Sequence, residues 1–199
     1  MRPMRLGLLA ALIFAVMAPA AMAQRLPPPG GGTAPAKAGT VDAAARKAGM
    51  ADAPAVIQAN NIDCQVSDAR LAGKGSKDPK TGITPSVYEV ACGANAIGYM
   101  IQTNGTQPAT VFSCLVVNYP ADMKPNTGNA CILPANQDLT AGVAALAAKA
   151  KVPCTPNGVR GIGQTSANTI VEMSCPNGAG YIITASVPLS VTKDAQALN

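Results

Sequence analysis

The feature of this sequence that most constrains its fold is a repeat built around cysteines. The pattern Cys-x5-Arg-x2-Gly occurs twice, over residues 64–73 and over residues 154–163. Downstream of each copy, a Glu three residues before a Cys and then a Gly-Tyr pair return in the same order. Internal repetition of this kind indicates two copies of one structural unit. We therefore expect two tandem modules.

The N-terminus has the pattern of an export signal. Arg2 and Arg5 precede an uncharged apolar run over residues 6–17, and residues 21–23 read Ala-Met-Ala, the small-residue pattern of a cleavage site. The apolar run is shorter than the ~20 residues that span a bilayer, which favours a cleaved leader over a membrane anchor. We predict a signal peptide over 1–23, no transmembrane segment after cleavage, and a periplasmic or secreted protein.

Export would place the six cysteines in a compartment where disulfides form. Disulfides persist outside the reducing cytosol, and a bridge across a loop of this size stabilises a fold by about 3 kcal/mol. If the two copies bond alike, the two cysteines of each copy pair with one another, and the two cysteines between the copies form a third bridge. The expected pairs are Cys64–Cys92, Cys154–Cys175 and Cys114–Cys131.

Hydrophobic periodicity within each copy predicts a small antiparallel meander. Apolar and polar residues alternate from 86 to 92, and Asn104-Gly105 is a strong hairpin signal because both residues tolerate positive φ. The fold class that follows is α+β, with two disulfide-stapled β-rich modules joined by a helix. The expected strands are 86–92, 97–102 and 110–117 in the first module, and 169–175, 181–186 and 189–192 in the second.

The predicted helix lies between the two copies. Leu139, Val143, Leu146 and Ala150 form one apolar helical stripe that packs on a sheet, and Pro153 stops the helix. The segment before the first copy is rich in Pro, Gly and Ala and has little to bury, so it is expected to be a tether with a short helix over 41–47. The expected division is a leader over 1–23, the tether over 24–53, module 1 over 54–136, the connecting helix over 137–152 and module 2 over 153–199.

The two copies differ in one loop and one disulfide. The Cys-to-Cys interval is 28 positions in the first copy and 21 in the second, and the extra length coincides with residues 74–82. We predict an inserted loop there, since loops tolerate added length at little entropic cost. Lys74, Lys77 and Lys80 are candidate recognition residues on this loop, and a plain solvated loop is the alternative. The bridge between the copies has no second counterpart, so the second copy is expected to be truncated.

The chain contains no histidine. This excludes Ser-His-Asp and Cys-His catalytic sites as well as zinc sites that use histidine. The cysteines show no C-x2-C spacing, which argues against a thioredoxin-like redox centre and a zinc site. We therefore expect no catalytic residues, no metal site and no cofactor.

The repeated glutamates, Glu89 and Glu172, allow two interpretations. Paired carboxylates carry out glycoside hydrolysis, which makes a Glu-dependent hydrolase one of them. The two residues occupy the same place in two copies of one module, however, and a duplicated fold repeats its framework. We favour structural ion pairs of Arg70 with Glu89 and of Arg160 with Glu172, each of modest benefit if exposed.

Two tyrosines are the remaining candidates for recognition, Tyr99 and Tyr181. Each shares strand parity with an isoleucine two residues on, so a half-buried ring packed on the core is the alternative. In neither copy does a motif with known chemistry surround the tyrosine.

Charge and composition narrow the function class. Loss of Arg2 and Arg5 with the leader lowers the formal charge by two, from +5 to +3, and no concentrated basic face with aromatic partners argues for nucleic acid. We expect an exported, non-catalytic binding or cell-envelope-associated protein whose partner is an unidentified protein or envelope component. The alternatives are an enzyme inhibitor or effector that presents the 74–82 loop and, less favoured, the hydrolase.

Overall fold

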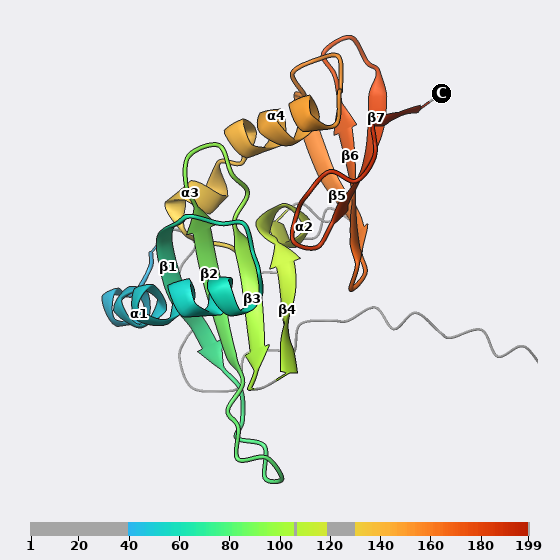
Figure 1. The fold of residues 1–199 in the computed structure, drawn as a ribbon. Helices are drawn as coiled ribbons and strands as arrows, with labels where there is room; N and C mark the ends of the chain where they lie inside the picture. Colours follow the sequence, from blue (N-terminus) through green and yellow to red (C-terminus); the bar gives the residue numbers. More distant parts are fainter. Residues whose placement is uncertain (1–39, 106, 119–129, 199) are drawn as a thin grey trace, which may run out of the picture.

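Two antiparallel sheets follow one another along the chain (Figure 1). The computed structural model describes residues 40–105, 107–118 and 130–198, and within them the strands form two four-stranded sheets, in the orders β1-β2-β3-β4 and β5-β6-β7-β8. Helices accompany both sheets, so the predicted α+β class is confirmed. The predicted leader and the first part of the predicted tether lie outside the described residues.

The first half is a helix followed by a meander. Its elements are α1 (Ala43–Ala59), β1 (Val66–Lys74), β2 (Ser86–Cys92), β3 (Tyr99–Asn104) and β4 (Gln107–Ser113). Gly105, in the turn between β3 and β4, has a φ of +68°, as the predicted Asn-Gly hairpin requires. Strand β1 was not predicted, because most of its residues are half-buried and show no clear alternation.

The second half repeats this order of elements. These are α4 (Thr140–Lys149), β5 (Gly158–Gln164), β6 (Asn168–Ser174), β7 (Gly180–Ser186) and β8 (Gln196–Leu198). The strand predicted over 189–192 is reduced to an isolated bridge between Val191 and Ala185, and β8 follows it. Each half thus consists of one helix and a four-stranded meander. The helix assigned to a connection from the sequence is the first element of the second repeat.

The strand predicted over 110–117 is wrong at its C-terminal end. Strand β4 stops at Ser113, and the next residues form the short helix α2 (Cys114–Asn118). The Ser113 hydroxyl accepts a hydrogen bond from Val116 N at 3.3 Å at the start of this helix. Leu115 of α2 is buried in the core of the second half. Tertiary packing therefore overrides the β propensity of this Val-rich stretch.

Helix α1 is longer than the short helix predicted over 41–47. Asp42 caps its N-terminus, where Oδ2 accepts a hydrogen bond from Ala45 N at 2.8 Å. The helix continues past residue 53, where the tether was expected to end, because Ala53 and Ile57 are buried against the first sheet. Gly49 lies against the backbone of β1 so closely that a Cβ atom would overlap it.

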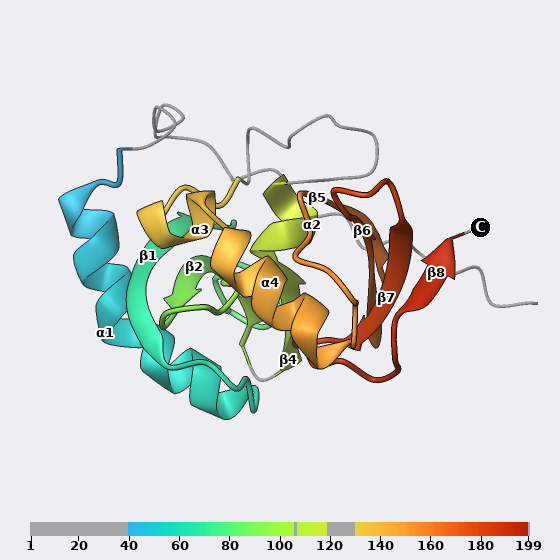
Figure 2. The same ribbon diagram turned by 90° about the horizontal axis from the view of Figure 1, so that it is seen from above.

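Helix α4 joins the two halves through a shared core. Its buried stripe includes Val143 and Leu146 and packs on Val171 of the second sheet, as predicted for a helix on a sheet. The same cluster contains Ile97, from the loop between β2 and β3, and Leu115 of α2. Figure 2 shows α4 between the two sheets and α1 at the outer side of the first.

All six cysteines lie in the described residues and are paired as predicted. The disulfides are Cys64–Cys92, Cys114–Cys131 and Cys154–Cys175. The first and the last join equivalent points, because each links the segment before the first strand to the end of the second strand. Among the described helices, none is long and apolar enough to cross a membrane.

The two sheets match in register as well as in order. Arg70 of β1 lies opposite Glu89 of β2, and Arg160 of β5 lies opposite Glu172 of β6. In both sheets a register shift follows the arginine and ends at the repeated glycine, which therefore marks a β-bulge. The repeat seen in the sequence is thus a repeat of strand pairing.

Candidate functional site

The two halves share one Arg–Glu pair and place it in different surroundings. Arg70 Nε donates to Glu89 Oε2 at 2.5 Å, and these side chains are 12% and 0% exposed. Arg160 donates to Glu172 Oε2 from Nε at 3.0 Å and from Nη2 at 2.6 Å, and these side chains are 44% and 27% exposed. One motif therefore gives a buried ion pair and an exposed one.

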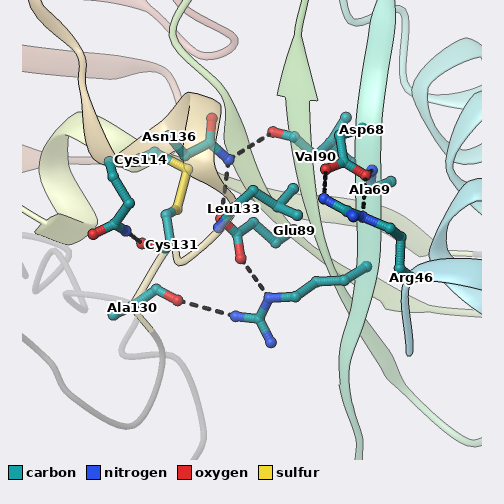
Figure 3. Close-up of polar contacts among 12 residues, drawn as sticks. Arg46, Asp68, Ala69, Glu89, Val90, Cys114, Ala130, Cys131, Leu133 and Asn136 are labelled. Carbon is teal, nitrogen blue, oxygen red and sulfur yellow. Dashed lines mark hydrogen bonds and ion pairs between the residues drawn. A yellow bond between two sulfur atoms is a disulfide. The ribbon is translucent and has the colours of Figure 1, made fainter. Parts of the chain in front are cut away.

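The buried carboxylate of Glu89 has a partner for each oxygen (Figure 3). Oε2 is bound by the arginine, and Oε1 accepts hydrogen bonds from Leu133 N at 2.8 Å and from Asn136 Nδ2 at 3.0 Å. The same amide nitrogen donates to Val90 O at 3.3 Å. A buried charge is tolerated when it is paired and its remaining lone pairs are bonded, and both conditions hold here.

The donors to Glu89 Oε1 come from a segment outside the sheet, residues 130–137, which we call the arm. It ends in the single-turn helix α3 (Pro134–Gln137) and is bound to α2 through the Cys114–Cys131 disulfide. Arg70 Nη2 donates to Ala130 O at 3.1 Å, so the ion pair contacts the arm from both of its members. A Cβ atom at Gly98 would overlap the side chain of Asn136, which explains the glycine at this position.

The Glu89 carboxylate also lies beside the disulfide that holds the arm. One carboxylate oxygen and the sulfur atoms of Cys114 and Cys131 lie within 4.8 Å of one another. Such a group could ligate a metal if the thiols were free. The two sulfur atoms are bonded to each other, so they offer no thiolate. The group is therefore a buried contact between the Cys114–Cys131 disulfide and the Glu89 carboxylate.

The exposed pair lies on a face of the second sheet where the described part of the chain places no arm. Burial alternates along β6, so Val171 and Met173 face the core beneath α4 whereas Ile170 and Glu172 face the other side. Among the described residues, no hydrogen-bond partner of Glu172 Oε1 is found. We call this side the open face. It comprises Arg160, Ile162, Ile170, Glu172, Ile182 and Leu198.

The open face is apolar around its ion pair. Ile162 is 40% exposed and Ile170 is 36% exposed. The positions equivalent to the three isoleucines of this face, counted from the repeated motif, lie in or against a buried cluster in the first half, where Met100 is buried and Ala72 and Val87 are half-buried. There, Ala72, Val87 and Met100 pack with Cys114, Val117 and Cys131 of α2 and the arm. Within the described residues, this sheet face is covered in the first half and uncovered in the second.

The two repeated glutamates differ in their access to solvent. Glu89 is sealed from solvent and bonded at both oxygens, and Glu172 is bound by Arg160. All six cysteines are in disulfides, and the chain has no histidine. Nucleophiles of the Cys-His and Ser-His type are therefore unavailable.

The two tyrosines predicted as recognition candidates lie in or against the cores. Tyr99 is buried in the first core, and this burial raises the pKa of its hydroxyl to about 12, with the Leu189 backbone acting in the opposite direction. Tyr181 is half-buried against the second core. Both occupy the packing position that was the alternative to recognition.

The lysines predicted on the inserted loop are all exposed: Lys74, Lys77 and Lys80. Figure 1 shows this loop, residues 75–85 between β1 and β2, projecting beyond the end of the first sheet. Backbone hydrogen bonds from Gly75 N to Pro85 O at 2.7 Å and from Asp78 N to Ile83 O at 2.8 Å join its two sides. The insertion is therefore an extended hairpin held by its own backbone.

A groove that was not predicted from the sequence runs along β4, the edge strand of the first sheet. It encloses about 340 Å³ between β4, the turn after β5 and residues 187–188. Two side-chain amides reach the edge of β4 there, those of Asn60 and Gln164. Single Asn and Gln residues carry no motif that would have revealed this arrangement.

Comparisons with known proteins identify no relative. No protein-family model matches the chain, and neither a curated protein nor a solved structure gives a significant match. Function is therefore inferred from the contacts of this chain.

Proposed function

We propose that the protein is an exported, non-catalytic binding or cell-envelope-associated protein and that the open face is its binding surface. The contrast between the two copies supports this proposal. On the first sheet, the protein's own arm and α2 cover this face. On the second sheet, the equivalent face presents an ion pair and exposed isoleucines.

The side chains on the open face are suited to burial. Where the covered copy has Ala72 and Val87, the open copy has the larger Ile162 and Ile170. Removing apolar surface from water is worth about 25 cal/mol per Å², and large exposed apolar patches mark binding surfaces. A partner that covers this face gains that burial.

The covered copy indicates the chemistry of the partner. The arm places Cys131 against the apolar side chains of the sheet, and it donates one backbone N–H and one side-chain amide N–H to Glu89 Oε1. Glu172 Oε1, which has no hydrogen-bond partner among the described residues, offers an acceptor in the same register. The expected partner is a protein or envelope component with an apolar surface and N–H donors at its centre.

Capture from envelope extracts of the cells that make the protein tests this proposal. We expect Ile162→Lys and Ile170→Lys to lower recovery of a specific partner by about tenfold or more, the loss of roughly 1.4 kcal/mol of binding. Met50→Lys is the matched control, because Met50 is also 40% exposed but lies on α1. Equal recovery by all three variants and the wild type would contradict a binding role for the open face.

The projecting loop supports a second candidate, an inhibitor or effector that presents lysine to an enzyme. Asp78 caps the tip by accepting hydrogen bonds from Lys80 N at 2.7 Å and from Thr81 N at 3.2 Å. Those N–H groups lower the pKa of Asp78, so the capping carboxylate stays charged. A rigid loop with exposed lysines suits the pocket of a lysine-specific protease.

Inhibition of a lysine-specific protease by the intact protein tests the second candidate. Lys77→Ala and Lys80→Ala should weaken inhibition, and Lys193→Ala, an exposed lysine of the second half, should leave it unchanged. Absence of inhibition by the wild-type protein would eliminate this candidate and leave the open-face proposal intact.

A further inference from the structure

The backbone groups of β4 alternate between β3 and the groove. Cys114 N, directly after the strand, donates to Gly98 O at 2.8 Å on the β3 side. Successive N–H groups of a strand point in opposite directions, so the N–H and C=O groups of the odd-numbered residues point away from β3. These residues are Ala109, Val111 and Ser113, and their outward groups form the edge of the sheet.

Side-chain amides already occupy both ends of this edge. Asn60 Oδ1 accepts a hydrogen bond from Ala109 N at 3.0 Å. Gln164 Nε2 donates to Val111 O at 2.5 Å, and Gln164 Oε1 accepts from Ser113 N at 3.5 Å. An amide that binds the C=O of one residue and the N–H two residues later reproduces the bonds of one residue in a parallel neighbouring strand. The Gln164 side chain therefore imitates a strand.

Between the two amides, one C=O and one N–H of the strand edge are spaced as the pair bound by Gln164 is, and they can still bind a neighbouring strand. We call this pair of groups the open step. Ala109 O and Val111 N point to the groove, and within the described part of the chain neither has a hydrogen-bond partner. The spacing of these two atoms along the strand is the same as that of the pair bound by Gln164. Unpaired N–H and C=O groups on a sheet edge are a template for an added strand.

We propose that this step binds an extended, uncharged peptide segment, which adds to β4 as a short parallel strand. One residue of the peptide donates its N–H to Ala109 O and accepts from Val111 N through its C=O. This is strand addition, in which the main chain supplies the affinity and the groove supplies the selectivity. The site is separate from the open face and does not depend on the function proposed for that face.

The lining of the groove sets the chemistry of the peptide. Its walls include Pro108, Val187 and Pro188 beside the hydroxyls of Thr165 and Ser166, and none of its lining residues is charged. A charged peptide side chain would lose its hydration there without gaining a partner, so uncharged, small or apolar side chains fit best.

The two amides at the ends of the step limit the length of the bound segment. Asn60 blocks extension in one direction and Gln164 in the other, so one peptide residue occupies the ladder and its neighbours leave the edge. The same amides obstruct direct pairing of β4 with β4 of a second copy. Removing the Gln164 side chain would open Val111 O and Ser113 N and lengthen the site by one step.

Amide hydrogen exchange of the full mature chain, followed by NMR, tests the site. The probe is the capped peptide acetyl-Ala-Val-Ser-Val-Ala-amide, and the matched controls are depsipeptides in which one N–H at a time is replaced by an ester oxygen. In the free protein, Val111 N–H should exchange faster than its strand neighbours, which bond to β3. Saturating peptide should slow that exchange about tenfold or more, and at least one depsipeptide should bind about five- to tenfold more weakly, the effect of one hydrogen bond.

A longer site should strengthen binding. Gln164→Ala should bind the peptide more tightly than the wild type, whereas Gln102→Ala, a change on β3 away from the groove, should not.

Three results would overturn the proposal. The first is that millimolar peptide does not change the hydrogen-exchange rate of Val111 N–H, either in the wild type or in Gln164→Ala. The second is equal affinity for the peptide and every depsipeptide. The third is protection of Val111 that grows with protein concentration in the absence of peptide, which would identify a second copy as the occupant.

Discussion

The two halves of the molecule carry the same Arg–Glu pair in the same strand register, yet one pair is covered and the other is open. In the first half, the arm donates two hydrogen bonds to Glu89 and shields it from water. In the second half, Glu172 accepts hydrogen bonds only from Arg160 among the described residues, and no described segment outside the sheet shields it from water. The repeat determines where the pair lies on the sheet, and the chain between the halves determines how much the pair contributes to stability.

The largest expected effect comes from removing one member of each pair in turn. Glu89→Ala leaves the mostly buried Arg70 without its counter-charge and should lower the free energy of unfolding by about 3–5 kcal/mol. Glu172→Ala, the matched change at the exposed pair, should lower it by less than about 1 kcal/mol. Urea unfolding measures both, and similar losses would break the contrast between the halves.

The next effect comes from releasing the arm. Replacing Cys114 and Cys131 with serine should lower the free energy of unfolding by about 3 kcal/mol through loss of the cross-link. We expect the arm to separate from the sheet more readily in that background and to expose Glu89, so Glu89→Ala should cost at least about 2 kcal/mol less than it does in the wild type. The control removes the Cys154–Cys175 bridge, which does not hold the arm. If Glu89→Ala costs as much without the Cys114–Cys131 disulfide as with it, the arm does not shield the Arg70–Glu89 pair from water.

The buried tyrosine of the first half predicts a loss of stability at alkaline pH. Burial raises the pKa of the Tyr99 hydroxyl to about 12, from the ordinary tyrosine value of about 10. The unfolded chain therefore loses this proton first, and raising the pH from 10 to 12 favours unfolding. The wild type should lose about 2–3 kcal/mol more than Tyr99→Phe across this window, by the equivalence of one pKa unit to 1.36 kcal/mol. Parallel stability curves for the two proteins would contradict the burial of this hydroxyl.

The smallest effect is the coupling energy of the exposed pair. A double-mutant cycle with Arg160→Ala and Glu172→Ala should give about 0.2–1 kcal/mol at low salt. Salt screens exposed charges, so this coupling should shrink toward zero at about 1 M NaCl. A coupling above about 2 kcal/mol that resists salt would mean that the second pair is shielded as the first one is.

The disulfides and the Arg–Glu pairs could be predicted because residues that repeat in the sequence occupy equivalent places in the two sheets. The equivalent positions of the cysteines predicted two disulfides and left Cys114 and Cys131 to form the third, and the shared Arg and Glu positions place each pair in one register. The helix of each repeat was assigned to a tether or a connection because α1 and α4 have no motif in common. The helix at 114–118 reads as a strand in the sequence, since its valines favour one and only tertiary packing decides otherwise.

The burial of Glu89 could not be predicted from its own neighbourhood in the sequence. Its two further donors, Leu133 and Asn136, lie 44 and 47 positions away and belong to neither copy of the motif. The groove along β4 is hidden for a similar reason. Gln164 and Val111 are 53 positions apart, and an amide that imitates a strand looks like any other glutamine in the sequence.

Carboxylate footprinting tests the central claim most directly. The protein is treated under native conditions with a carbodiimide and glycine ethyl ester, and modification of each glutamate is read by mass spectrometry. We predict that Glu172 is modified and Glu89 is not, and that Glu89 becomes reactive when Cys114 and Cys131 are replaced by serine. Equal modification of the two glutamates in the intact protein would contradict the division into a covered and an open copy.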